Sequence, residues 1–110
     1  MTVTRTAIFE GRIKPGYEDV FFKEVRDKLV PLWRQFPGAL DVRLLEIDQR
    51  DEDAAPIVMM QQIDYADLAA IDAALQSPQR TAARAATMDV MEMFEGRFYH
   101  LISPSNVLAG

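Results

Sequence analysis

The chain has 110 residues, 49% of them hydrophobic and 26% charged, with a formal net charge of −5. This composition is typical of one globular domain with a real core, and the acidic balance argues against a nucleic-acid partner, whose binders usually carry a basic stripe. The chain has no cysteine and a single histidine, His100, which excludes disulfides, thiol nucleophiles and thiolate metal sites.

Targeting and membrane signals are not found in the sequence. No apolar run approaches the ~20 residues of a membrane span, and residues 1–6 contain no apolar signal core. We therefore predict one cytoplasmic domain over residues 1–110, with no membrane partner. A zinc site would need carboxylates for most of its ligands, which is uncommon, so no metal and no other cofactor is predicted.

Residues 4–13 alternate with a period of two, as a strand does when one of its faces covers a core. One face carries Ala7, Phe9, Gly11 and Ile13. The other face carries Thr4, Thr6, Ile8, Glu10 and Arg12.

The segment between Pro15-Gly16 and Pro37-Gly38 predicts an amphipathic helix. Pro31 lies inside it, where a proline removes a backbone hydrogen bond and crowds the carbonyl of Asp27. Because the apolar stripe continues past this point, we expect a kink near residues 27–31, or a second helical piece, and not the end of the helix. The stripe follows spacings of three and four residues: Phe21, Val25, Leu29, Leu32 and Phe36.

Two further strands are predicted at residues 39–48 and 56–63. The polar connector at residues 48–53 is acidic enough to attract a cation, but a solvated hairpin loop explains it better. Residues 57–60 are apolar on both faces, which is typical of a strand buried on both sides.

The second helical region shows cap signals at several positions. Asp64 is predicted as an N-cap with Asp67 as its capping-box partner, and Ser77-Pro78 restarts the helix. Gly96 is predicted to stop it. A last strand follows at residues 97–103, on which Phe98 and His100 share one face.

The predicted order is β-α-β-β-α-β, an α+β ferredoxin-like sandwich with both helical regions on one face of a four-stranded antiparallel sheet. The other face is left partly apolar, with Ile8 and residues 57–60. An exposed apolar face of this size usually marks an interface, so a sheet-to-sheet homodimer is predicted.

Two short runs of the sequence resemble the dimeric α/β-barrel superfamily. They are Arg12-Ile13-Lys14-Pro15-Gly16 after the first strand and Phe36-Pro37-Gly38-Ala39-Leu40 before the second. Antibiotic-biosynthesis-monooxygenase-like domains look most similar, with ether-degradation-type domains as the competitor. The resemblance covers nearly the whole chain, including the Ser77-Pro78 break. It implies a homodimeric barrel with a ligand cleft between sheet and helices in each subunit.

Some relatives within this superfamily oxidise aromatic polyketides without metal or flavin, and others degrade haem. The haem-degrading branch has an asparagine on the first strand, where this chain has Phe9. It also has a tryptophan and a histidine in the second helical region, and residues 65–94 contain neither. Haem degradation is therefore not expected.

His100 is the candidate catalytic residue, because only a histidine has an unperturbed pKa near neutrality. The alternative is a histidine bonded to protein groups at the barrel or dimer interface. Trp33, Phe9, Arg43 and Gln61 are the candidate substrate-binding residues.

Each candidate also has a structural interpretation. Trp33 is either a pocket wall or a core or dimer anchor, and Arg43 either receives an anionic ligand or pairs with a carboxylate such as Asp41 or Glu10. Arg80 and Arg84 lie one turn apart and are able to hold a carboxylate, although a solvated helix face is the simpler interpretation.

Two functions therefore remain open. The first is a cofactor-independent monooxygenase or isomerase that deprotonates a small aromatic or polyketide-like compound. The second is a non-catalytic dimeric ligand-binding or accessory protein on the same fold. A cleft with polar groups converging on a void favours the enzyme, and a cleft filled by Trp33, Phe36 and methionines favours the binding protein.

Overall fold

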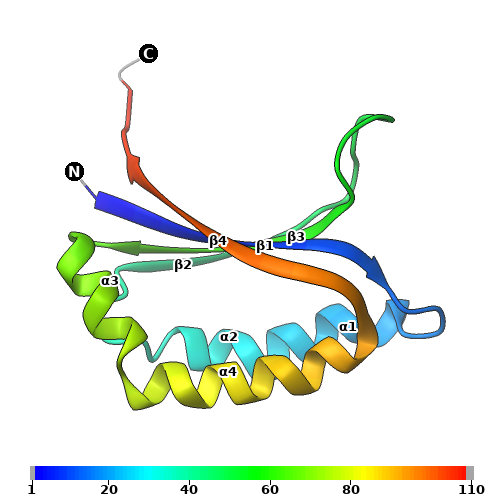
Figure 1. The fold of residues 1–110 in the computed structure, drawn as a ribbon, viewed down its shortest axis with the longest axis horizontal. Helices are drawn as coiled ribbons and strands as arrows, with labels where there is room; N and C mark the ends of the chain where they lie inside the picture. The colour runs from blue at the N-terminus through cyan, green and yellow to red at the C-terminus, as the bar shows by residue number, and fades with distance from the viewer. Residues whose placement is uncertain (1, 109–110) are drawn as a thin grey trace.

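The computed structural model describes residues 2–108 as a four-stranded antiparallel sheet with helices on one face (Figure 1). The strands lie in the order β2-β3-β1-β4. This is the predicted βαββαβ ferredoxin-like sandwich. The elements in chain order are β1 (Thr2–Ile13), α1 (Glu18–Glu24), the π-helical turn η1 (Val25–Leu29), α2 (Val30–Trp33), β2 (Asp41–Glu46), β3 (Ile57–Tyr65), α3 (Leu68–Leu75), α4 (Pro78–Val90), the 3-10 turn η2 (Met91–Met93) and β4 (Phe94–Ser105).

The first helical region accommodates Pro31 without ending, as predicted. The π turn η1 precedes the proline, and the N–H of Val30 donates to the carbonyl of Val25, five residues back. A π turn holds more residues than the about 3.6 of an α-helical turn, so a stripe spaced by four residues stays on one face. Trp33, at 4% exposure, continues that stripe, whereas the predicted Leu32 is only partly buried.

The predicted N-cap at Asp64 is wrong, because Asp64 belongs to β3 and its carboxylate pairs with Arg43 on the sheet. Asp67 is the N-cap of α3, with its side chain accepting from the N–H of Ala70 at 2.8 Å. The cap predicted at Ser77 is confirmed by the hydroxyl of Ser77, which accepts from the N–H of Arg80 at 3.2 Å.

The prediction that Gly96 ends a helix is wrong. Gly96 lies in β4, opposite Gly11 of β1. Its φ of +149° falls where side chains are strained, and a Cβ there would lie 2.1 Å from the carbonyl oxygen of Glu10. A Cβ at Gly11 would meet the carbonyl oxygen of Glu95 at 2.0 Å. The two glycines therefore permit a close approach of β1 and β4.

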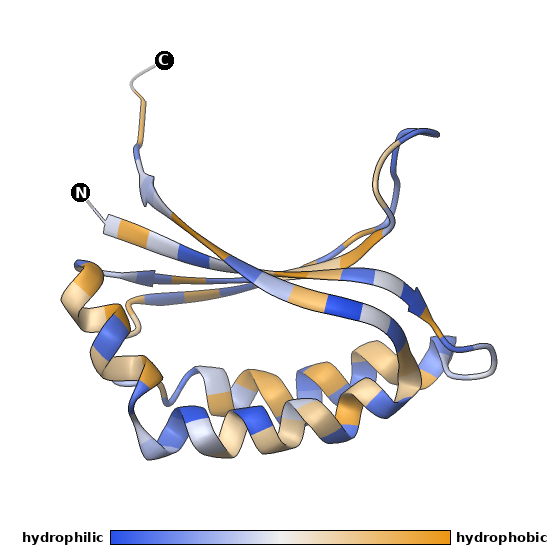
Figure 2. Ribbon diagram, in the orientation of Figure 1, coloured by the Kyte–Doolittle hydropathy of each residue, from blue (hydrophilic) through white to orange (hydrophobic). Residues whose placement is uncertain are grey.

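The two faces of the sheet differ in what covers them. The face toward the helices supplies the core, including Met59, Ile63 and Tyr65 of β3, all at most 2% exposed. No helix within residues 2–108 covers the other face, and the strands show alternating hydrophobic and hydrophilic residues along their length (Figures 1 and 2). The uncovered face carries exposed Leu45 and Leu101 beside polar side chains.

Membrane insertion through a helix has no support in the described chain. Among residues 2–108, no helix is both long and apolar enough to cross a bilayer.

Candidate functional site

A cavity of about 80 Å³ lies between the core face of the sheet and the helices α2 and α4. Three strands, the end of α2 and one side of α4 contribute to its wall. A volume of this size suits a ligand of about one ring. The lining residues are Arg5, Ala7, Phe9, Trp33, Phe36, Gln61, Arg80, Ala83, Arg84, Thr87, Phe98 and His100.

Four of the five predicted catalytic and substrate-binding residues line this one cavity: Phe9, Trp33, Gln61 and His100. They come from β1, α2, β3 and β4, so the fold brings together residues up to 91 positions apart, from Phe9 to His100. The side chains of Gln61 and Trp33 are 6% and 4% exposed as residues. Their burial means that a ligand in the cavity would meet preformed walls.

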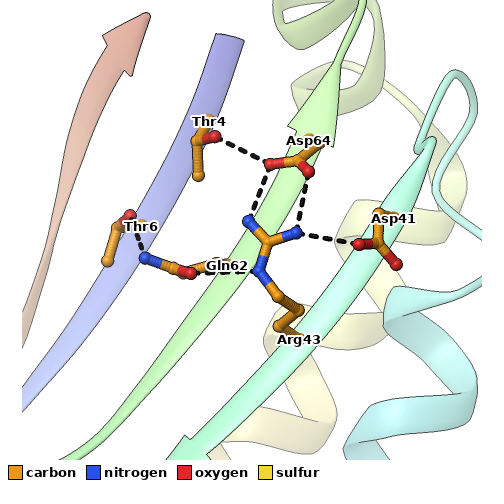
Figure 3. A network of polar contacts seen from close by, with 6 residues as sticks. All are labelled: Thr4, Thr6, Asp41, Arg43, Gln62 and Asp64. Carbon is orange, nitrogen blue, oxygen red and sulfur yellow. Dashed lines mark hydrogen bonds and ion pairs between the residues drawn. The ribbon is translucent and has the colours of Figure 1, made fainter. Parts of the chain in front are cut away.

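Arg43 does not line the cavity, because the pleat of β2 directs it to the uncovered face of the sheet (Figure 3). Its guanidinium bonds both carboxylate oxygens of Asp64, at 2.7 and 2.8 Å, and Asp41 at 2.9 Å. Gln62 accepts from Nε of Arg43 at 3.1 Å, and Thr4 donates to Asp64 at 2.7 Å. Of the two alternatives for Arg43, the structure shows pairing with a carboxylate such as Asp41, and its bidentate partner Asp64 was not predicted. The prediction that Arg43 binds substrate finds no support in the lining of this cavity.

This network has the electrostatics of a structural ion pair. The hydrogen bonds from Arg43 hold the pKa of Asp64 below its ordinary value, with burial opposing and the Thr4 hydroxyl assisting. The bond to Asp64 likewise raises the pKa of Arg43. Because the guanidinium already bonds two carboxylates, Arg43 has little capacity left for an anionic ligand.

Aromatic rings form one end of the cavity. Phe9 and Phe98 face each other across β1 and β4, with stacked rings whose centroids are 5.2 Å apart. The rings of His100 and Phe98 are nearly perpendicular, with centroids 6.0 Å apart. Phe98 was noted in the sequence only for sharing a face with His100, and its stacking partner follows from the strand register.

His100 lies in the middle of the cavity wall, opposite Ala7 of β1. Burial, together with the positive charges of Arg5 and Arg80, lowers the pKa of His100 to about 4. The role predicted for His100 rests on an ordinary pKa near neutrality, and the surroundings of the imidazole do not provide it. At neutral pH the imidazole is uncharged and free to accept a proton, but it is a weaker base than an ordinary histidine.

Three arginines give the cavity wall positive charge. Arg5 comes from β1, and Arg80 and Arg84 come from α4. Burial lowers the pKa of Arg5, and the charge of Arg80 lowers it further. Sequence reasoning missed Arg5, although it falls on the same alternating face as Ala7 and Phe9, and a charge on a core face is a usable signal.

Metal binding finds no ready site in the described part of the chain. Across residues 2–108, no group of three or more His, Asp or Glu side chains is placed to hold an ion.

The fold and the cavity together define a ferredoxin-like α+β domain with a small aromatic and cationic pocket under its sheet. The model of the antibiotic biosynthesis monooxygenase family matches residues 4–86. The chain belongs to this family, as its resemblance predicted, and is thus a small-molecule-processing protein of this fold.

Solved structures with this fold confirm the architecture at low sequence identity. An ethyl tert-butyl ether ("ethd") family protein from Bacillus halodurans C-125 aligns with a TM-score of 0.74 at 20% identity, covering 96% of this chain and all of that one. An antibiotic biosynthesis monooxygenase aligns at 0.63 and 20% identity, covering 97% and 100%. A dimeric ferredoxin-like protein from Bacteroides fragilis aligns at 0.64 and 9% identity, covering 92% and 93%. No curated protein matches the chain.

Proposed function

We propose that the protein is a homodimeric, cofactor-independent monooxygenase or isomerase that acts on a small aromatic compound in this cavity. The observation that carries the proposal is the convergence of Phe9, Phe98 and Trp33 with His100 and Gln61 on one void. Aromatic walls hold a flat ring, and a few placed polar groups set its orientation.

In the monooxygenase reaction, the hydroxyl group of a phenol loses its proton, and a ring carbon of the phenolate forms a bond to dioxygen. The resulting hydroperoxide loses water to leave a quinone, so that one phenol and one dioxygen give one quinone and one water. Dioxygen is the oxidant, and it takes the electrons of the broken C–H and O–H bonds. In the isomerase reaction, a carbon next to a carbonyl group of the substrate loses its proton to give an enolate, and the proton then returns to a different carbon, so that no oxidant is needed.

The residues of the cavity assist the first step, in which the proton passes from the phenol to a side chain of the cavity. Because the proton stays within the site, the total charge of the site does not change. His100 accepts the proton, and the nearby guanidinium groups stabilise the phenolate oxygen. The charges that make His100 a weak base also make the phenol a stronger acid. Gln61 is buried in the cavity wall. Its side-chain amide supplies one donor or acceptor for a hydrogen bond to the substrate.

Dimerisation through the uncovered face of the sheet belongs to this proposal. Leu45 and Leu101, 37% and 54% exposed, lie on that face, and Met60 and Ile8 lie between them. Burying such a face would remove apolar area from water. The similar protein from Bacteroides fragilis is dimeric, which supports the proposal. Sedimentation at micromolar concentration should give the mass of two chains, and a monomer would contradict the dimer. The cytoplasmic location and the absence of a cofactor stay predictions.

A non-catalytic ligand-binding or accessory protein is the second candidate, and the low pKa of His100 favours it. At about 4, this pKa leaves the only histidine poorly matched to proton abstraction near neutrality. The same cavity would then bind an aromatic compound without changing it.

Oxygen uptake separates the two candidates. A panel of phenols and hydroquinones is incubated with the protein, and oxygen consumption and product mass are measured. For the enzyme, His100→Ala should lower turnover by about 100-fold or more while the dimer persists. Tyr99→Phe is the matched control, because Tyr99 is the neighbouring residue and its hydroxyl faces Glu10, away from the cavity. Ligand binding with neither oxygen uptake nor isomerisation would favour the second candidate.

A further inference from the structure

The three arginines of the cavity differ from most other arginines of the chain in having no carboxylate partner. Within residues 2–108, Arg12, Arg26, Arg43 and Arg97 each form an ion pair with an acidic side chain. No described carboxylate lies within ion-pair distance of the cavity arginines, Arg5, Arg80 and Arg84. In a chain with a formal charge of −5, acidic groups are plentiful, so their absence from this wall is notable.

Two of the three positive charges, Arg5 and Arg80, lie close enough to affect each other and His100. The charge of Arg80 lowers the pKa of Arg5, and both lower the pKa of His100. Like charges held together in a partly dry cavity repel each other, and an anion between them would remove that repulsion. Guanidinium groups also match the planar geometry of a carboxylate, with two parallel N–H donors.

The strand β1 sets the direction of the cavity. Arg5, Ala7 and Phe9 follow one another on its cavity face, so the charged end and the aromatic end are separated by about 13 Å of strand. His100 lies opposite Ala7, between the two ends. A ring against Phe9 and Phe98 would therefore point a substituent past His100 toward Arg5.

We propose that the compound bound in this cavity is a small aromatic carboxylate, with its ring among the aromatic side chains and its carboxylate on Arg5, Arg80 and Arg84. This inference rests on the proposed function for the location of the substrate, and it adds the chemical class. It has a consequence for His100: a bound carboxylate offsets the two guanidinium charges and raises the pKa of the imidazole. The substrate thus makes its own base stronger.

Binding of benzoate tests the inference without any turnover. Trp33 is the only tryptophan and lines the cavity, so its fluorescence reports occupancy, and the only histidine gives a single imidazole signal by NMR. Benzoate should bind at least about 10-fold more tightly than benzamide, which has the same shape and no charge. It should also raise the pKa of His100, whereas benzamide should leave it unchanged.

Two arginine variants locate the charged end. Arg80→Met and Arg84→Met should each weaken benzoate binding by about 10-fold or more and leave benzamide binding unchanged. Arg84 is exposed on α4, so its replacement leaves the core intact, and circular dichroism checks both folds. Arg34→Met is the matched control, because Arg34 is exposed at the end of α2 and does not line the cavity.

Benzoate and benzamide binding equally well, or benzoate binding unaffected by both variants, would overturn the inference. Acetate binding as tightly as benzoate would also overturn it, because it would show a general anion site with no role for the ring. The outcome is separate from the proposed function. If benzoate binding depends on the arginines but no oxygen is consumed, the inference holds and the proposed monooxygenase activity is wrong. If the protein consumes oxygen with neutral phenols but does not bind benzoate, the activity holds and the inference is wrong.

Discussion

Replacing His100 by glutamine should change how the free energy of unfolding depends on pH. In the folded protein the pKa of His100 is about 4, whereas an unfolded histidine titrates at about 6.5. Between these values the unfolded chain binds the proton more readily, so protonation favours unfolding. The contribution of neutral His100 is therefore complete above pH about 6.5, falls as the pH drops, and is lost by pH about 4.

The size of this contribution is limited by solvent. A pKa difference of this kind converts to about 3 kcal/mol if fully felt, but His100 is exposed to solvent on one side of the cavity wall. Water screens the guanidinium charges there, so we expect about 1 kcal/mol. Relative to the native protein, His100→Gln should gain about 1 kcal/mol of stability between pH about 7.5 and pH about 4.5.

Urea unfolding followed by Trp33 fluorescence measures this difference. Both proteins are compared at one concentration, because dimer stability depends on it. Carboxylates titrate equally in both and cancel in the difference. NMR of the imidazole gives the folded pKa directly, and Arg80→Met should raise it. A folded pKa at or above about 6.5, or a difference in stability that is constant with pH, would refute the reasoning.

Two further substitutions probe the scaffold. Gly96→Ala should destabilise the fold by more than about 2 kcal/mol, since its Cβ would lie 2.1 Å from the carbonyl oxygen of Glu10. Gly16→Ala is the control, with φ of +92° but no atom within 4 Å, and equal losses of melting temperature would contradict the close-approach argument. Arg43→Met should cost about 1–3 kcal/mol by leaving Asp64 without its partner, measured by urea unfolding. It should leave benzoate affinity unchanged, because Arg43 lies across the sheet from the cavity, and weakened affinity would contradict that placement.

The order of elements and the faces of β1 were predictable, because period-two alternation is a local property of the sequence. The start of a helix at Ser77-Pro78 was also predictable, because its cap signal is likewise local in the sequence. Asp64 and Gly96 were misread because each has a long-range role, in an ion pair with Arg43 and in a close approach to Gly11. A local cap signal does not distinguish these uses.

The candidate site was predictable only in part. Strand alternation indicated that Phe98 and His100 share a face, and four named residues meet in one cavity. The pKa of His100 depends on Arg5 and Arg80, which lie 95 and 20 positions away in the chain. The shift therefore needed the tertiary structure.

The π turn before Pro31 has a consequence for the shape of the cavity. Such a turn carries the equivalent of one extra residue, and each residue of a helix rotates the chain by about 100°. If the same residues were wound as a regular α-helix, everything after Leu29 would rotate by about 100°, and Trp33 would leave the cavity wall. Deleting one residue from Val25–Leu29 would instead remove the extra residue and return Trp33 to its present angular position. The π turn therefore lets the chain carry one additional residue before Pro31 without moving the aromatic wall.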